Sequence, residues 1–402
     1  MVQNITLEEA IEMIMDNVSA LSIKRVAFMD ALGCILAEDI FAPINQPPFN
    51  RSPLDGYAVR AEDIKMACRE HPAVLSVVDC VYAGMASKRR ILLGEAVKIT
   101  TGAMLPEGCD AVIRQEDTDY GTKQVAVYQS VKPYQNYCFA GEEYRKGELL
   151  LSKGVFIDAS VLGVLSGAGI ADDIPVYAMP SVAIVCTGSE IVSPHETILP
   201  DGKIYGINGI YLQARLKELG VKEVRVFHTA DETEKIVSLL QEQWNNYDLI
   251  ITTGGVSVGE KDLMHTVLPM LGAEQLFWRV LLKPGTPAMF SLKDGKPILS
   301  LSGNPFAAAA TFELLARPLI AKQSGNTNLL MKKTYAKLQN DFPKASPGRR
   351  LIRAIYENGT VWVPETHASG MMQSFIGCNC LVDIPAGSAA LSTGIIVQVH
   401  LL

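Results

Sequence analysis

The sequence predicts a multidomain protein that combines an α/β region with β-rich parts, and three observations support this. The chain has 402 residues, more than a single hydrophobic core usually serves, so about two to four domains are expected. Apolar strands alternate with helical patterns between residues 181 and 319, which favours a mostly parallel sheet covered on both faces. Short β-type runs divided by Gly, Pro and Asp turns occupy 59–131 and 333–402.

The N-terminal part predicts helices and a loop. Thr6 followed by Glu9 forms a capping box, and an apolar stripe at helical spacing comes after it. A second helix is expected at 30–37, and 41–53 is expected to be loop because it holds four prolines. The expected strands of a small β-rich domain follow at 74–81, 96–100, 111–114 and 124–131, and an apolar helix at 159–165.

The central region predicts repeated strand and helix units. Strands are expected at 181–186, 223–227, 248–252, 274–282, 288–291 and 298–301. Helices are expected at 208–219, 231–244, 262–270 and 304–319. The alternation then stops, and 333–402 is rich in Val, Ile and Thr with Gly and Pro turns, which indicates a small barrel or sandwich.

Composition excludes several classes of protein. The net charge of −7 disfavours a general nucleic-acid binder, which normally carries a basic excess. The first ten residues do not resemble a secretory signal, and no apolar run is long enough to span a bilayer, so we expect a cytoplasmic protein without membrane contact. The eight cysteines form no CxxC pair and the six histidines are dispersed, which favours reduced thiols over a zinc site.

The most informative segment is 247–262, in which a buried strand runs into a glycine turn and then a helix. Gly254 and Gly255 lack the side chains that would keep a phosphate away from the backbone amides. The helix start offers free N–H groups, and Asp262 is placed to hold a metal or to cap the helix. The alternative is an ordinary strand-to-helix turn capped by Ser257.

Charged residues and amide-rich turns lie at the other expected strands as well, with Arg279 inside the strand 274–282 and the rest after strand ends, and the carboxyl ends of parallel strands meet at one rim. They are Glu190, Asp231, Arg279, Lys283, Gly303, Asn304 and Pro305. Carboxylates beside anion-binding turns suggest a divalent metal between them, and Mg²⁺ prefers such oxygen ligands. The alternative treats Asp231 as a helix cap, Glu190 as solvated and Lys283 as a surface charge.

Nine segments in order along the chain carry a family resemblance. They are SPLDGYAV (52–59), ITTGAMLPEGCDAVIRQE (99–116), AGEE (140–143), IVCTGSEI (184–191), TTGGVSVGEKD (252–262), LLKPGTP (281–287), SLSGNP (300–305), PGRRLIR (347–353) and ASGMMQSFIGCN (368–379). Together they resemble the molybdopterin molybdenumtransferase family of the MoeA type, whose animal relative is the E domain of gephyrin.

The resemblance implies an activity and an architecture. Members insert molybdate into adenylylated molybdopterin with Mg²⁺ and release AMP, and they are homodimers of four domains with an active site shared between subunits. Molybdopterin adenylyltransferase and acceptor molybdoenzymes are the partners that this implies. The implied domains are a stem of 1–45 with 142–178, a β-rich domain of 46–141, an α/β domain of 179–328 and a C-terminal β-barrel of 329–402.

The resemblance also implies roles for individual residues. Those matched to residues important for activity are Asp55, Glu190, Asp231, Asp262 and Lys283, of which Glu190, Asp231 and Asp262 would hold the metal. Those matched to substrate binding are Thr101, Glu143, Gly254, Gly255, Ser257, Arg279, Gly303, Asn304, Pro305, Arg353 and Ser369, with Arg353 and Ser369 in the molybdate pocket. The implied chemistry is metal-assisted cleavage of the adenylyl phosphoanhydride with dithiolene transfer to molybdate.

The sequence departs from the family pattern at several positions. Cys138 stands in place of an Arg, Glu143 in place of an Asp, and Thr286 in place of a frequent Lys. Gly206 and Ser189 each replace an Asp. These departures keep two alternatives open beside the transferase: a variant that prefers tungstate, and a non-catalytic paralogue that binds the cofactor or acts as a scaffold.

Overall fold

The computed structural model describes residues 1–256 and 263–402, which form two compact units. Unit 1 consists of 1–25, 33–37 and 175–402, and unit 2 consists of 26–32 and 38–174. The finer division into four domains expected from the sequence stays a prediction.

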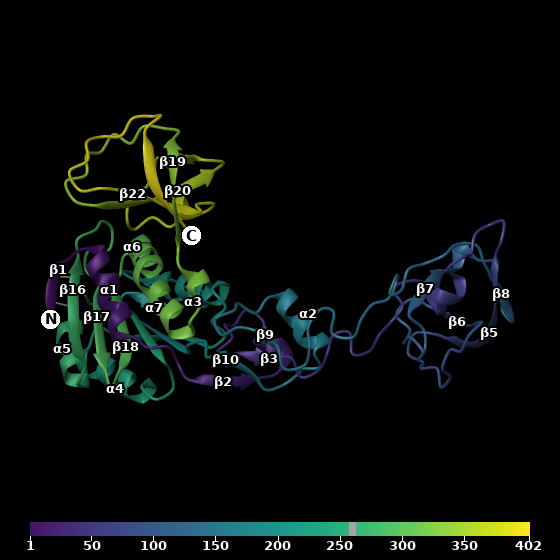
Figure 1. The fold of residues 1–402 in the computed structure, drawn as a ribbon. Helices are drawn as coiled ribbons and strands as arrows, with labels where there is room; N and C mark the ends of the chain where they lie inside the picture. The colour runs from purple at the N-terminus through teal and green to yellow at the C-terminus, as the bar shows by residue number, and fades with distance from the viewer. Residues whose placement is uncertain (257–262) are drawn as a thin grey trace. The chain divides into compact units, whose positions relative to one another are not determined.

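Unit 1 contains a seven-stranded sheet in the order β1-β16-β17-β18-β15-β11-β14. Figure 1 labels β1, β16, β17 and β18 of this sheet. Its strands are β1 (Val2–Ile5), β11 (Val182–Thr187), β14 (Val224–Thr229), β15 (Leu249–Thr253), β16 (Glu274–Val280), β17 (Met289–Lys293) and β18 (Lys296–Leu301). β17 runs antiparallel to both neighbours, whereas the other pairs in this sheet are parallel. The expected mostly parallel sheet is therefore confirmed.

Helices cover both faces of this sheet, because its strands are apolar on both sides. Ile184 points into the core formed with α1 (Leu7–Asn17), α3 (Asn208–Glu218), α6 (Pro305–Thr311) and α7 (Arg317–Ser324). The next residue, Val185, points to the opposite face, into the core formed with α4 (Thr233–Gln243) and α5 (Met264–Leu271). The capping box of α1 is confirmed, since the Thr6 and Glu9 side chains each accept the other residue's backbone N–H.

The C-terminal strands of unit 1 close into a barrel in the order β19-β21-β20-β22-β23, as the sequence suggested. They are β19 (Lys332–Leu338), β20 (Arg350–Glu357), β21 (Thr360–Trp362), β22 (Cys380–Ile384) and β23 (Ile396–Leu401). Leu351 and Leu381 of this barrel are buried in the same core as α1, α6 and α7. The barrel is therefore packed onto one helical face of the α/β sheet.

Unit 2 is built around a five-stranded sheet in the order β7-β4-β6-β5-β8. Its strands are β4 (Gly56–Val59), β5 (Ala73–Val81), β6 (Glu95–Ile99), β7 (Ala111–Arg114) and β8 (Gln124–Val127). The pair β3 (Ile40–Phe41) and β9 (Leu149–Leu151) and the helix α2 (Ala159–Gly167) complete the unit. The expected β-rich region is confirmed.

Two expectations for helices are corrected. Residues 30–37 do not form a helix: a 3₁₀ turn covers Phe28–Ala31, Gly33 has a positive φ of 80°, and Leu36 then pairs as extended chain with Val176. The single helix expected at 304–319 is divided by a π-helical turn at Phe312–Ala316, between α6 and α7. Within the described ranges, no helix combines the length and apolar character needed to cross a bilayer.

Candidate active site

The ends of β11, β15 and β18 approach one another closely, and glycine makes this possible. Gly254 follows β15 with a φ of 98°, and a Cβ there would lie 2.6 Å from Oγ1 of Thr187 at the end of β11. The Gly254 N–H donates to the carbonyl of Leu301 in β18 at 3.1 Å. The glycine turn therefore joins three strand ends, and only a residue without a side chain fits there.

These strand ends open into a cavity of about 870 Å³ in unit 1. Predicted site residues that line it are Glu190, Asp231, Gly254, Gly255, Lys283, Gly303, Asn304, Pro305 and Ser369. The sequence predicted that the strand-end residues would share one rim, and the structure brings them together apart from Arg279, which does not line the cavity. The cavity is also lined by residues of the barrel, which the topology of the sheet alone could not indicate.

Two carboxylates lie on the sheet side of the cavity. Asp231 accepts the Ser189 N–H through Oδ2 at 3.1 Å, and its own N–H donates to the Ser189 hydroxyl at 3.3 Å. Glu190 is exposed beside this pair. In the part of the chain that the structure describes, no three acidic, histidine or cysteine side chains cluster as a metal site. Asp262 and Ser257, the other predicted residues of this wall, lie outside the described residues.

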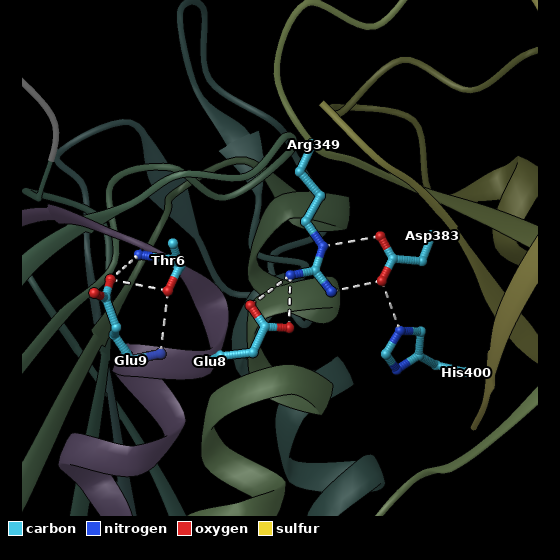
Figure 2. Close-up of polar contacts among 6 residues, drawn as sticks. All are labelled: Thr6, Glu8, Glu9, Arg349, Asp383 and His400. Atoms are coloured by element: carbon cyan, nitrogen blue, oxygen red, sulfur yellow. Dashed lines mark hydrogen bonds and ion pairs between the residues drawn. The ribbon is translucent and has the colours of Figure 1, made fainter. Parts of the chain in front are cut away.

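Lys283 is fixed by main-chain bonds to the barrel. Its N–H donates to the Arg349 carbonyl at 2.9 Å, and its carbonyl accepts the Leu351 N–H at 2.7 Å. Arg349 is itself held by ion pairs to Glu8 of α1 and to Asp383 of β22 (Figure 2). The position of Lys283 at the cavity is therefore determined by the contact between barrel and sheet.

Two predicted cationic residues do not line the cavity. Arg279 has a φ of 69° and its guanidinium lies 5.5 Å from the ring centre of Trp278. Arg353 is fully buried, and it donates to the carbonyls of Met371 at 2.6 Å and Ala368 at 2.7 Å. Its guanidinium also stacks 4.0 Å from the Phe306 ring centre. Arg353 thus orders the loop that carries Ser369.

Sequence reasoning missed three basic residues of the barrel that line the cavity: Lys344, Arg350 and His367. Arg350 lay within a quoted motif, but that motif gave no sign of which side chain would face the cavity. Lys344 and His367 are separated along the chain and carried no motif signal. Only the closed barrel brings them together.

Asn208 and His228 also line the cavity. The Asn208 amide donates to the Gly303 carbonyl at 2.9 Å, and its Oδ1 is buried with no partner among the described residues. Burial lowers the pKa of His228, which favours the neutral imidazole. Gly206 packs against this histidine, since a Cβ there would lie 3.5 Å from Cε1 of His228 and 3.0 Å from Ile191. The departure at Gly206 therefore avoids a tight contact with the Ile191 side chain, whereas the distance to His228 is an ordinary contact.

The remaining predicted residues belong to unit 2. Asp55 accepts the N–H of Thr101 at 2.7 Å and its hydroxyl at 2.9 Å, and these bonds lower the pKa of Asp55. Glu143 is exposed, and its N–H donates to the Gln46 carbonyl at 2.9 Å. The Cys138 thiol donates to Glu142 at 2.8 Å, which raises the pKa of Cys138. Asp55 and Thr101 are thus joined by hydrogen bonds, and Glu143 takes no part in these bonds.

Family comparisons cover almost the whole chain. Residues 5–169 match the MoeA N-terminal region (domain I and II), 183–322 match a probable molybdopterin binding domain, and 335–402 match the MoeA C-terminal region (domain IV).

Curated relatives and solved structures agree with these matches. Proteins named molybdopterin molybdenumtransferase from Staphylococcus epidermidis and Staphylococcus aureus are 34% and 35% identical to this chain, covering 99% of it and 95% of their own lengths. Two crystal structures of MoeA proteins from Pyrococcus horikoshii are 33% and 32% identical, with TM-scores of 0.87 and 0.80. They cover 99% of this chain, and 99% and 100% of their own chains are matched. The chain therefore belongs to the MoeA family.

Proposed function

We propose that this chain is a molybdopterin molybdenumtransferase, which inserts molybdate into adenylylated molybdopterin and releases AMP in the biosynthesis of the molybdenum cofactor. One observation carries the proposal: a single cavity contains carboxylates of the sheet side together with cations of the barrel. Such a cavity offers separate positions for a metal-bound phosphate and for an oxyanion. The names of the curated relatives support the same reaction.

The residues of the sheet side fit a magnesium ion. Mg²⁺ is usually held by one or two carboxylates together with substrate phosphates and water, and Glu190 and Asp231 supply two carboxylates at the same cavity. Asp262 is the third residue we propose for this role. When bound, the ion would act as a Lewis acid on the phosphoanhydride of the adenylylated pterin.

The glycine turns and the amide of Asn208 would position the substrate. Gly254 and Gly303 line the cavity, and a Cβ would point at Thr187 from Gly254 and at the Gly254 backbone from Gly303, so these glycines allow the close approach of strand ends that shapes this wall. The unpartnered Oδ1 of Asn208 is an acceptor for a donor group of the substrate. Gly255, Asn304 and Pro305 would shape the same wall, with Ser257 as a further donor.

Lys283 and the barrel would supply positive charge. The Lys283 ammonium can stabilise negative charge on the leaving phosphate or on the oxyanion. The main chain of Lys283 is fixed by hydrogen bonds to Arg349 and Leu351 of the barrel. Ser369 adds a hydroxyl donor in the same cavity. Arg279 and Arg353 would act through the segments they support, since neither lines the cavity.

We propose further that the protein is a cytoplasmic homodimer in which Asp55, Thr101 and Glu143 of one subunit complete the site of the other. The bond between Asp55 and Thr101 supports a shared role for these two residues. Molybdopterin adenylyltransferase would supply the substrate, and acceptor molybdoenzymes would receive the product.

Reconstitution tests the activity. Purified protein is mixed with adenylylated molybdopterin, Mg²⁺ and either molybdate or tungstate, and released AMP is measured. Release with molybdate supports the transferase, and release with tungstate alone identifies the tungstate-preferring variant. Absence of AMP with both oxyanions would contradict the transferase and favour the non-catalytic paralogue.

A matched pair of variants tests the assignment of the carboxylates. Glu190→Gln should lower AMP release by about a hundredfold, because it removes a proposed carboxylate ligand of the ion that would stabilise charge in the transition state. Glu196→Gln changes an exposed carboxylate of the same segment that does not line the cavity, and it should keep wild-type turnover. Equal activities of the two variants would contradict the role of Glu190.

A further inference from the structure

Lys283 has an exposed side chain, so packing does not fix it and its main chain determines the region that the ammonium can reach. This main chain is held on both sides by the start of β20, through the carbonyl of Arg349 and the N–H of Leu351. The two bonds form an isolated parallel bridge between Lys283 and Arg350. The place of Lys283 at the cavity therefore depends on how firmly the start of β20 is held.

Both of these bonds lead to Asp383 of β22. Leu351 lies opposite Asp383 in the antiparallel pair of β20 and β22. The Asp383 carboxylate also accepts two bonds from the guanidinium of Arg349, from Nε at 2.9 Å and from Nη2 at 2.6 Å. The residue that accepts the Lys283 N–H and the residue that donates to the Lys283 carbonyl are thus both placed by one buried acid.

A further residue holds each side of this ion pair. Nε2 of His400 in β23 lies 3.0 Å from Oδ2 of Asp383, and it must carry the proton because an ionised carboxylate only accepts. On the other side, Nη1 of Arg349 donates to both carboxylate oxygens of Glu8 in α1 at 2.8 Å. Figure 2 shows the continuous contacts from Glu8 to His400. They tie helix α1 to the barrel at the point where Lys283 is attached.

The segment that carries Lys283 is also folded on itself. The Val280 N–H donates to the Thr286 carbonyl at 2.9 Å, which closes a turn around Lys283. A Cβ on Gly285 would lie 2.2 Å from Cγ2 of Thr311, so this turn is packed closely against α6. These contacts do not involve the barrel. Loss of the ion pairs should therefore leave the turn in place and change only how Lys283 is held against the barrel.

We infer that Arg349 is a positioning residue for the reaction, because its side-chain bonds to Asp383 and Glu8 hold the main chain that fixes Lys283 at the cavity. The inference rests on the proposed function for the role of Lys283. Among the described residues, Arg349 is not part of the cavity wall, so it acts through the lysine and not on the substrate. Electrostatic stabilisation depends on where the charge stands, so a small displacement of the ammonium lowers turnover steeply.

Hydrogen exchange of the full-length protein tests the positioning without any turnover. In Arg349→Gln the segment 281–288 should exchange about tenfold faster, because the Lys283 N–H loses a fixed acceptor. Arg349→Lys keeps the charge but cannot bind two carboxylates with a planar fork, so it should give a smaller increase. This second variant also serves if Arg349→Gln does not fold. Wild-type exchange in the folded variants would overturn the inference.

Arg215 provides the matched control, because it is bound in the same way at another point of unit 1. It pairs with one buried and one exposed carboxylate, Glu313 and Glu218, and its side chain is 18% exposed, against 20% for Arg349. Arg215→Gln should leave the exchange of 281–288 and the turnover as they are in the wild type. An equal acceleration by Arg215→Gln would indicate general loosening of unit 1 and would overturn the inference.

A double-mutant cycle tests whether Arg349 acts through Lys283. Arg349→Gln alone should lower kcat for AMP release by about tenfold or more, with a smaller change in KM for adenylylated molybdopterin. In a protein that already carries Lys283→Met, the same substitution should have little further effect, because the group that it positions is gone. A tenfold loss in both backgrounds would contradict action through the lysine.

The outcomes separate this inference from the proposed function. Faster exchange of 281–288 in the Arg349 variants of a protein that releases no AMP would retain the positioning of Lys283 and reject the transferase. Release of AMP by a protein whose Arg349 variants show unchanged exchange and turnover would retain the transferase and reject the positioning role. Circular dichroism of each variant confirms that a loss of turnover does not come from unfolding.

Discussion

Arg349 and Asp383 form a two-point ion pair, with Nε 2.9 Å from Oδ1 and Nη2 2.6 Å from Oδ2. The same guanidinium reaches both carboxylate oxygens of Glu8 through Nη1 at 2.8 Å, and His400 lies 3.0 Å from Asp383 (Figure 2). Asp383 and Glu8 thus share one arginine but differ in environment. The Asp383 side chain is 5% exposed, and that of Glu8 is 60% exposed.

This difference predicts unequal costs of removing the two carboxylates. Asp383→Asn should lower the free energy of unfolding by about 3 kcal/mol, because it leaves Arg349 without its buried partner. Glu8→Gln should cost less than about 1 kcal/mol, since water screens an exposed pair. Urea unfolding of both variants measures the costs, and equal losses would contradict a dominant role for the buried pair.

The ionisation of Asp383 predicts a loss of stability in acid. Burial opposes its charge, but bonds from His400 and Arg349 outweigh burial and lower the pKa of Asp383 from 3.8 to about 2. A lowered pKa means that the unfolded chain binds the proton more readily, so this stabilisation is present above about pH 4 and disappears as the pH falls through about 2. The contribution is about 2 kcal/mol at neutral pH.

Unfolding experiments between neutral pH and about pH 2 measure how the free energy of unfolding falls with pH and so check this prediction. Asp383→Asn has no carboxyl to titrate at this position, so its stability should fall less steeply in acid than that of the wild type. Parallel curves for the two proteins would show that other groups cause the acid transition.

Close packing at the glycine turn predicts a large effect of Gly254→Ala. A left-handed conformation costs an alanine roughly 1–2 kcal/mol, and the clash with Thr187 should add about 1–3 kcal/mol. Gly272→Ala is the matched control, because Gly272 has a φ of 80° but open space around its Cβ position. Thermal unfolding should show a larger loss of stability for Gly254→Ala than for Gly272→Ala. Similar losses would mean that Thr187 can move aside without a measurable cost.

The Thr101 bonds predict a change in the acidity of Asp55. Thr101→Val removes the hydroxyl donor but keeps the backbone donor, so the pKa of Asp55 should rise part of the way toward its ordinary value. Thr100→Val is the control, since the Thr100 hydroxyl accepts the Ala83 N–H rather than contacting Asp55. NMR titration of the Asp55 carboxyl distinguishes them, and an unchanged pKa in Thr101→Val would exclude the hydroxyl as a cause.

The sequence was informative where burial produces a repeated pattern. The continuous apolar run of β11 is visible because both faces of that strand are covered, and the residues after Thr187 and Thr253 could be placed at one rim from the direction of parallel strands. The glycine turn was recognisable because its backbone requirement excludes other residues. The strands and the glycine turn could be predicted because they depend on residues that are close together along the chain.

Other parts depend on partners that are distant along the chain. The π-helical turn contains the buried Glu313, which pairs with Arg215 at 2.6 Å and with Arg317 at 3.0 Å, and a helical apolar pattern does not reveal such a pair. The burial of Arg353 and the alignment of Lys344 with His367 likewise arise from the closure of the barrel. A motif identified Arg353, but only the packed structure shows that its guanidinium donates to the carbonyls of Ala368 and Met371.

The pairing of β1 with β16 has a consequence for the order in which the protein can fold. Val2 lies opposite Phe277 and Ile5 opposite Val280, so the edge of the sheet is completed only after the ribosome has made both segments. All residues of unit 2 lie between β1 and β16 along the chain, so unit 2 can fold before β16 has been made. During synthesis β1 and the apolar side of α1 therefore stay without their folded partners until β16 and the helices of the same core have been made.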